Sequence, residues 1–141
     1  MTISTPVPVV QLTASSNLLQ LGLAATQTLV AGLNIIIFDT EGVDADNEYN
    51  PATGVVTAAT VGPRTVTGLL SSDDGAIAET FIYVDGAPYR TITLSPTNAE
   101  IVIAVSLVLA IGQTMSVRCN RATSGTDIVG DLSRTWLNIA K

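Results

Sequence analysis

Apolar and polar residues alternate along much of the chain, which predicts β-strands that bury one face. Leucine recurs at every second position over residues 19–23, and apolar residues do the same over residues 115–119. The second stretch includes Cys119, and this spacing assigns it to the core as a small apolar side chain. Other stretches rich in β-branched residues lie at 33–40, 54–61, 64–72, 79–95, 99–122 and 134–141.

Turn-forming residues separate these stretches, and residues 124–131 are expected to form a turn-rich link. Gly62-Pro63, Asp73-Asp74-Gly75 and Ile111-Gly112-Gln113 each fall between two apolar runs, and Asp85-Gly86 has the composition of a tight hairpin turn. Short strands with turn signals roughly every 8–12 residues are typical of an all-β sandwich or barrel.

The 141 residues are enough for one domain. Pro6 and Pro8 resist helix formation and predict an extended arm over residues 1–10. We therefore expect this arm followed by a single domain over residues 11–141.

The composition indicates a large buried surface, since 47% of the residues are hydrophobic and only 13% are charged. The longest apolar stretch, residues 101–111, is too short for a spanning helix, which needs about 20 residues. A membrane protein is therefore not expected, and an apolar interface between copies of the chain is the better explanation.

The charged residues exclude several functions. The net charge is −6 and the six basic residues are scattered, so no basic stripe for nucleic acid is expected. The chain has no histidine, which excludes Ser-His-Asp and Cys-His catalysis and histidine-ligated metals. Cys119 is the single cysteine and lacks a base, so we expect no enzyme. The first twelve residues lack the pattern of a secretory signal, which predicts synthesis and assembly in a cytoplasm.

Two segments resemble the globular head of the complement and tumour-necrosis-factor superfamily. In that family an apolar strand ends in Phe-Asp, and an Asn-x-Tyr-Asp segment, a Thr-Gly turn and a strand leading to Gly follow; a later Leu-x-Leu-x-x-Gly segment completes the pattern. The matching positions are Phe38, Asp39, Asn47, Tyr49, Thr53, Gly54, Gly62, Leu107, Leu109 and Gly112.

The resemblance implies a jelly-roll sandwich of about ten antiparallel strands that assembles as a compact homotrimer. Similar domains occur in bacteriophage virions, as capsid decoration proteins and as fibre tips. The expected function is thus a non-enzymatic capsid decoration or cement protein, located on the virion surface and bound to the major capsid protein. The alternative is a receptor-binding tip of a head or tail fibre that recognises cell-surface glycan through Tyr89 or Trp136, and a soluble signalling head is a further rival.

Two sets of residues are candidates for contacts with other chains. For the threefold contact of the trimer the candidates are Ile101, Ile103, Val105, Leu107, Leu109 and Trp136, with ordinary sandwich core as the equal alternative for the run on residues 101–109. For the capsid contact they are Thr5, Pro6, Val7 and Pro8 in the arm.

The acidic segment after residue 38 is a weak calcium candidate. Asp44, Asp46 and Glu48 offer oxygen ligands at alternate positions but lack the glycine and terminal bidentate glutamate of a calcium loop. The simpler interpretation is a solvated connector, and no other cofactor is expected.

Overall fold

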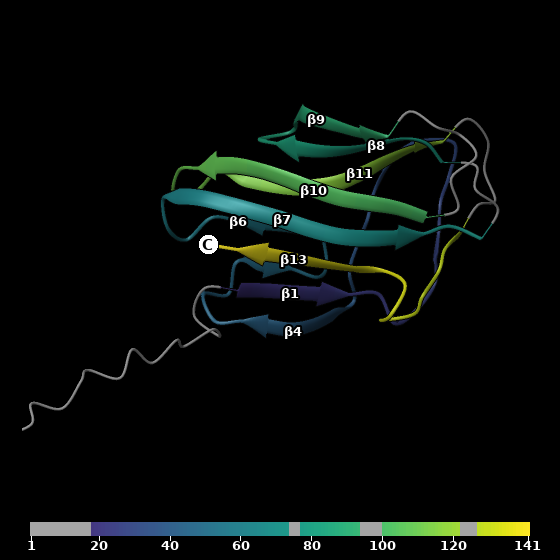
Figure 1. Ribbon diagram of the computed structural model, residues 1–141, viewed down its shortest axis with the longest axis horizontal. Helices are drawn as coiled ribbons and strands as arrows, with labels where there is room; N and C mark the ends of the chain where they lie inside the picture. Colours follow the sequence, from purple (N-terminus) through teal and green to yellow (C-terminus); the bar gives the residue numbers. More distant parts are fainter. Residues whose placement is uncertain (1–17, 74–76, 94–99, 122–126) are drawn as a thin grey trace, which may run out of the picture.

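The computed structural model describes residues 18–73, 77–93, 100–121 and 127–141, and these form an all-β sandwich. Two antiparallel sheets pack face to face (Figure 1). One has five strands in the order β10 (Glu100–Leu109), β7 (Gly62–Ser71), β13 (Trp136–Ala140), β1 (Leu18–Gly22) and β4 (Thr40–Asp44). The predicted arm over residues 1–10, with the candidate capsid contacts Thr5, Pro6, Val7 and Pro8, lies outside the described residues.

The second sheet has six strands. Its path is β5 (Tyr49–Asn50), β6 (Val55–Thr57), β11 (Thr114–Arg121), β8 (Ile77–Val84) and β9 (Ala87–Thr93), and β3 (Gly32–Ile35) also pairs with β11. A two-stranded ribbon of β12 (Asp127–Ile128) and β2 (Gln27–Thr28) completes the fold. In the described part of the chain three of the thirteen strands have only two residues. The expected jelly roll of about ten antiparallel strands is thus confirmed.

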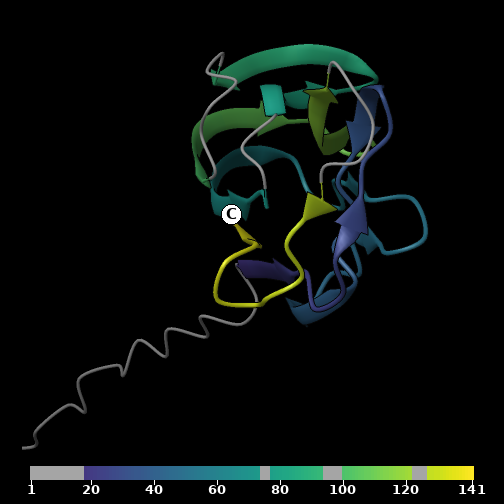
Figure 2. The same cartoon turned by 90° about the vertical axis from the view of Figure 1, so that its right-hand side faces the viewer.

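The core lies between the two sheets, which Figure 2 shows as curved layers around a shared interior. It is aliphatic: Phe38 and Tyr49 are its aromatic members. The predicted alternation is confirmed, because Leu19, Leu21 and Leu23 are buried, as are Met115, Val117 and Cys119. Alternate residues of each strand point to opposite faces of a sheet, so this spacing delivers one apolar face to the interior.

Two of the predicted turns are confirmed and a third is wrong. Asp85 and Gly86 both have positive φ (49° and 78°) and join β8 to β9, as a two-residue hairpin turn requires. Gly112 (φ 84°) lies in the turn between β10 and β11. Gly62, in contrast, begins β7, so Gly62-Pro63 is the start of a strand and not a turn.

Three local predictions were wrong in extent. The strand expected over residues 33–40 ends at Ile35, and the Ile36 N–H still donates to the Val117 carbonyl of β11. The Gln27 side-chain amide satisfies the other edge: it donates to the Ile35 carbonyl and accepts from the Ile37 N–H. The acidic segment is only partly a connector, since residues 40–44 form β4 against β1. The expected link over residues 124–131 contributes β12.

Candidate functional site

Asp44 holds the end of the acidic segment in place. Its carboxylate accepts the backbone N–H groups of Glu48 (2.9 Å) and Tyr49 (3.0 Å), and the backbone of Asn47 adopts a positive φ of 52° in this turn. An Asp side chain that bonds nearby backbone groups is a common turn device. The geometry therefore fits the connector interpretation of this carboxylate.

A buried ionic cluster begins at Glu48, directly after this turn in the sequence. Glu48 and Arg64 are 4% and 2% exposed, and the Arg64 guanidinium lies 3.4 Å from Glu48 Oε1. The same carboxylate oxygen accepts the Ala59 N–H, and the guanidinium donates to the Thr60 carbonyl. Lys141 Nζ pairs with Asp46 and lies 3.5 Å from Glu48 Oε2. This cluster could not be predicted from the sequence, because Arg64 occupies an alternating inward position of a strand where an apolar residue is expected.

These contacts bear on the calcium candidates Asp44, Asp46 and Glu48. Each of the three carboxylates is engaged by donors of the chain itself. Within the described ranges no group of three or more metal-ligating side chains converges. A calcium site here is a prediction that only a binding experiment can test.

The family-pattern positions around residue 38 are structural. Phe38 is buried, and its N–H and C=O both bond to the Tyr49 hydroxyl at 2.7 and 2.9 Å. Burial raises the pKa of Tyr49 to about 12, so the hydroxyl keeps its proton. Asp39 accepts the N–H groups of Ala24 and Ala25, and although desolvation opposes it, these bonds lower the pKa of Asp39.

The remaining pattern positions also shape the backbone. Gly54 (φ 73°) closes a turn in which its own N–H and that of Thr53 donate to the Asn50 carbonyl. A Cβ at Gly54 would lie 2.8 Å from the Ile35 side chain, so the position requires glycine. Leu107 and Leu109 are buried in the core. The pattern therefore encodes the fold and not a reactive centre.

Most of the candidate trimer contacts need correction. Ile101, Ile103, Leu107 and Leu109 are buried inside the single chain, and Val105 packs against the same core. Their side chains are therefore not available to another copy, and the alternative interpretation as sandwich core holds for them. The opposite face of β10 is the exposed one: Val102 and Val108 are 70% and 68% exposed.

The outward face of the five-stranded sheet is uncharged over most of its area, and we call it the uncharged sheet face. Cross-strand pairing continues the exposed positions of β10 onto β7, β13 and β1. The residues of this face are Val102, Ala104, Ser106, Val108, Pro63, Thr65, Thr67, Leu69, Trp136, Asn138, Ala140, Leu18 and Gln20. Glu100 lies at its margin, at the first position of β10. The candidate trimer residues on β10 are those of the inward parity, so they are not part of this face.

Trp136, the sixth residue predicted for the trimer contact, lies on this face. It pairs with Leu69 on one side and Gly22 on the other. Together with Leu132, which is 52% exposed and packs over Gly22, it lines a cavity of about 150 Å³. This shallow apolar hollow is suited to an apolar side chain of a partner.

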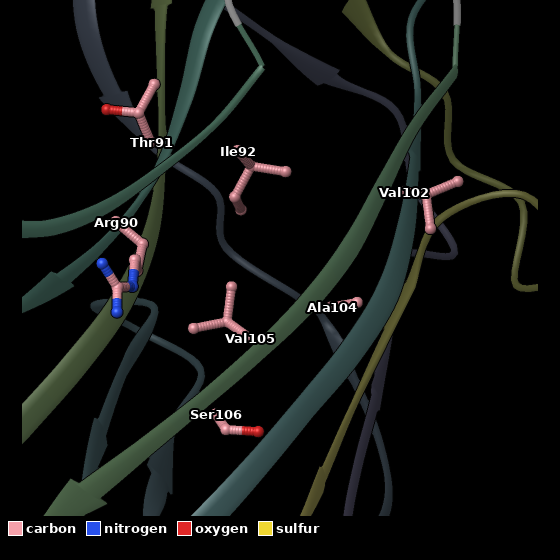
Figure 3. Close-up of a pocket in the computed structure, with 7 residues that line it drawn as sticks. All are labelled: Arg90, Thr91, Ile92, Val102, Ala104, Val105 and Ser106. Atoms are coloured by element: carbon pink, nitrogen blue, oxygen red, sulfur yellow. The ribbon is translucent and has the colours of Figure 1, made fainter.

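A larger cavity of about 450 Å³ lies between β9 and β10, where an edge of one sheet meets an edge of the other (Figure 3). Ile92 and Val105 point into the gap, while Ser106 points to the other side of β10. Arg90 contributes the charge of this groove, and its lining residues include no carboxylate or thiol. The groove thus offers binding contacts but no acid–base pair for hydrolysis.

Cys119 is fully buried and burial raises the pKa of its thiol to about 12. A thiol in this state is not a nucleophile. Its sulfur lies 3.6 Å from Thr80 Oγ1. The described residues include no helix long and apolar enough to span a membrane.

Comparison with known proteins shows which known fold the chain has. No family model matches the sequence, and the search of curated proteins finds no relative. Among solved structures the chain is similar to murine APRIL at pH 8.0, with a TM-score of 0.68, 13% identity, and 89% of this chain and 98% of that chain covered. The fold is that of the tumour-necrosis-factor and complement globular heads.

Two further structures support this assignment. The Eiger TNF of S. frugiperda has a TM-score of 0.66 at 12% identity, covering 89% of this chain and 91% of that one. The globular domain of the zebrafish complement 1qA protein has a TM-score of 0.61 at 12% identity, covering 87% and 92%. At such low identity the similarity defines the jelly roll and not a shared activity.

Proposed function

We propose that the protein is a non-enzymatic structural subunit of a bacteriophage virion, which decorates or cements the capsid as a homotrimer. Its partners are two further copies of the chain and the major capsid protein, and its location is the virion surface. The uncharged sheet face is the observation that carries the proposal. A monomer gains nothing from an uncharged surface of this extent, whereas a second copy can bury it.

The geometry of a trimer supports the proposed role. A trimer has three equivalent docking surfaces, which match the threefold positions where capsid subunits meet. Each chain then needs only a modest contact with the capsid. Once one chain of the trimer is bound, the linkage raises the effective concentration of the other two chains at their own capsid sites. The jelly-roll fold and the family resemblance support a trimer in preference to a dimer.

Co-sedimentation tests the capsid part of this proposal. Purified chain is incubated with capsids of the phage that encodes it, prepared without the chain, and the capsids are pelleted. We expect saturable binding at three copies per threefold position. Chain that stays in the supernatant, or that binds at another stoichiometry, would contradict the proposal.

The arm over residues 1–10 gives a second test of the same proposal. If this segment holds the capsid, its deletion should weaken co-sedimentation by a large factor while the oligomer keeps its mass. Unchanged binding by the deletion variant would refute the assignment of Thr5, Pro6, Val7 and Pro8 as capsid contacts.

A receptor-binding fibre tip is the second candidate. The observation that favours it is an exposed aromatic side chain on the six-stranded sheet, Tyr89, which is 44% exposed and lies under the Arg90 guanidinium. Binding of the chain to host cells in the absence of capsid would favour this candidate over decoration.

A further inference from the structure

Two strand edges border the groove between β9 and β10. β9 is the last strand along the six-stranded sheet and β10 is the first of the five-stranded sheet, so among the described strands each pairs on one side only. The lining of the groove comes from residues 90–92 of β9 and from residues 102 and 104–106 of β10. The groove is therefore flanked along its length by backbone N–H and C=O groups that no described strand uses.

The interior of the groove is apolar. Ile92 and Val105 point into the gap from its two sides (Figure 3), and both are partly buried against the core. An apolar side chain that enters between them removes apolar surface from water on both sides. This is how an anchor residue in a pocket contributes binding energy.

Arg90 gives the groove its charge. It pairs with the buried Ile82 of β8, and paired residues of neighbouring strands share one face of a sheet. Arg90 thus belongs to the inward side of β9, as Ile92 does two residues later. In the part of the chain that the structure describes, no carboxylate lies within ion-pair distance of the Arg90 guanidinium. The groove therefore holds a cation that its own walls do not neutralise.

The edge of β9 does not suit every partner strand. Pro88 has no N–H to donate, and the register against β8 shifts twice, which makes the edge less regular. The inward charge of Arg90 also excludes a wholly apolar strand, because the guanidinium would be buried without a counter-charge. A strand with a carboxylate opposite Arg90 removes that penalty. These features therefore select for an acidic partner strand.

We propose that the groove binds an extended peptide segment of another protein, which adds as an antiparallel strand to the free edge of β9. An apolar side chain of the segment lies between Ile92 and Val105, and a carboxylate two residues later pairs with Arg90. The spacing is two because alternate residues of a strand share a face, and the apolar residue comes first because an antiparallel strand reaches Ile92 before Arg90. Strand addition takes its affinity from backbone bonds and its specificity from alternate side chains.

Other occupants fit the groove less well. A small-molecule site has several polar side chains that converge on one point, whereas here Arg90 is the charged side chain of the lining and the other polar groups run along the strands. The N-terminal segment of the chain itself does not supply the carboxylate, since residues 1–17 contain no Asp or Glu. The inference rests on the groove alone and does not depend on the capsid proposal.

Fluorescence polarisation with designed peptides tests the inference. The probe is the labelled, capped peptide Ser-Thr-Ile-Thr-Glu-Thr-Ser, titrated with the full chain. One matched peptide has Gln in place of Glu, and the other, Ser-Thr-Ile-Glu-Thr-Thr-Ser, has the same composition with Glu on the opposite face of the strand. We expect saturable binding of the probe and binding at least about tenfold weaker for both matched peptides, as loss of a charged hydrogen bond implies.

Three results would overturn the proposal. They are equal binding of the three peptides, no saturable binding of the probe at chain concentrations up to about 1 mM, and competition by free N-acetylglutamate as strong as that by the unlabelled peptide. The last result would make the groove a site for a small anion. All three comparisons use the unmodified chain, so they do not depend on the folding of a variant.

Hydrogen exchange followed by NMR locates the bound strand. Strand addition should slow exchange of backbone N–H groups between Tyr89 and Ile92 when the probe is at saturation. The edge amides of β4, at the far end of the other sheet, should exchange as before. Unchanged exchange in β9 with the peptide bound would refute the assignment of this edge.

Substitutions of Arg90 test the carboxylate contact. Arg90→Gln should weaken binding of the probe about tenfold and remove its advantage over the Gln peptide. Arg90→Glu should reverse the preference, so that a peptide with Lys in place of Glu binds more tightly than the probe. Arg134→Gln, which removes an exposed arginine from the turn before β13, should leave binding unchanged. Equal losses in Arg90→Gln and Arg134→Gln, or an unchanged preference in Arg90→Glu, would contradict the proposal.

Discussion

Tyr49 connects the acidic segment to the core by a single hydroxyl. Replacement by Phe removes that hydroxyl and leaves the buried N–H and C=O of Phe38 without their partner. We expect Tyr49→Phe to lower the free energy of unfolding by about 1–3 kcal/mol in urea denaturation. Tyr89→Phe is the matched control, and a cost as large as that of Tyr49→Phe would contradict the account.

Asp39 makes the stability of the fold depend on pH in the acid range. Its pKa lies below the ordinary value of 3.8 in the folded chain, so its contribution is present above that value and is lost as the pH falls through the folded-state pKa. We expect Asp39→Asn to be less stable than the unmodified chain at pH 7, and the difference to shrink towards pH 2. Thermal unfolding at a series of pH values measures this, and a pH-independent difference would contradict it.

The effect of the buried ionic cluster on stability arises from the desolvation of its charges. Arg64→Met leaves the Glu48 carboxylate buried with the Ala59 N–H and the Lys141 ammonium as partners, and breaking such a pair costs about 3–5 kcal/mol. The double variant Arg64→Met with Glu48→Gln should recover part of that loss, since the uncompensated charge is gone. Denaturant unfolding of the three chains checks this, and a double variant no more stable than Arg64→Met would be the opposite result.

Glycine substitutions in two turns test how the chain passes from one strand to the next. Gly54 and Gly86 both have positive φ, but a Cβ at Gly54 would meet Ile35 and Ile36, whereas nothing lies within 4 Å of one at Gly86. Gly86→Ala should therefore cost only the backbone term of about 1–2 kcal/mol. Gly54→Ala should cost clearly more, because the Ile35 side chain and Ile36 carbonyl must also shift. Equal losses in denaturant unfolding would contradict the structure.

Strands with a clear period of two were predictable from the sequence, and others were not. The alternation at residues 19–23 and 115–119 and the Asp85-Gly86 turn are local signals, and all three were predicted correctly. The pairing of β2 with β12 joins residues about a hundred positions apart, so no local pattern reveals it. No local pattern reveals the role of Gln27 either. Its side-chain amide bonds the backbone of Ile35 and Ile37, where a neighbouring strand would otherwise pair.

The candidate sites were less predictable than the fold. Residues 101–109 are apolar at both parities, so the sequence could not decide which parity faces the core. The register with β7 decides it, since Ile101 and Leu107 point inward while Val102 and Val108 point outward.

The assembled molecule should not depend on calcium. Asp44, Asp46 and Glu48 are held by donors of the chain itself, so we expect a chelator to find no structural ion there. We expect the solution mass from light scattering to be the same with and without a chelator. A trimer that dissociates on chelation would establish the acidic segment as a structural metal site.

The central claim is that copies of the chain associate through the uncharged sheet face. Thr67 lies within this face, between Ala104 and Asn138, whereas Thr57 is an exposed threonine on β6 of the other sheet. An unpaired charge buried in an interface costs several kcal/mol, so Thr67→Asp should abolish association.

Light scattering of three purified chains is therefore the most direct measurement. We predict three times the chain mass of 14.6 kDa for the unmodified protein and for Thr57→Asp, and a single chain mass for Thr67→Asp. A monomeric unmodified chain, or a Thr67→Asp variant that still forms the trimer, would contradict the account.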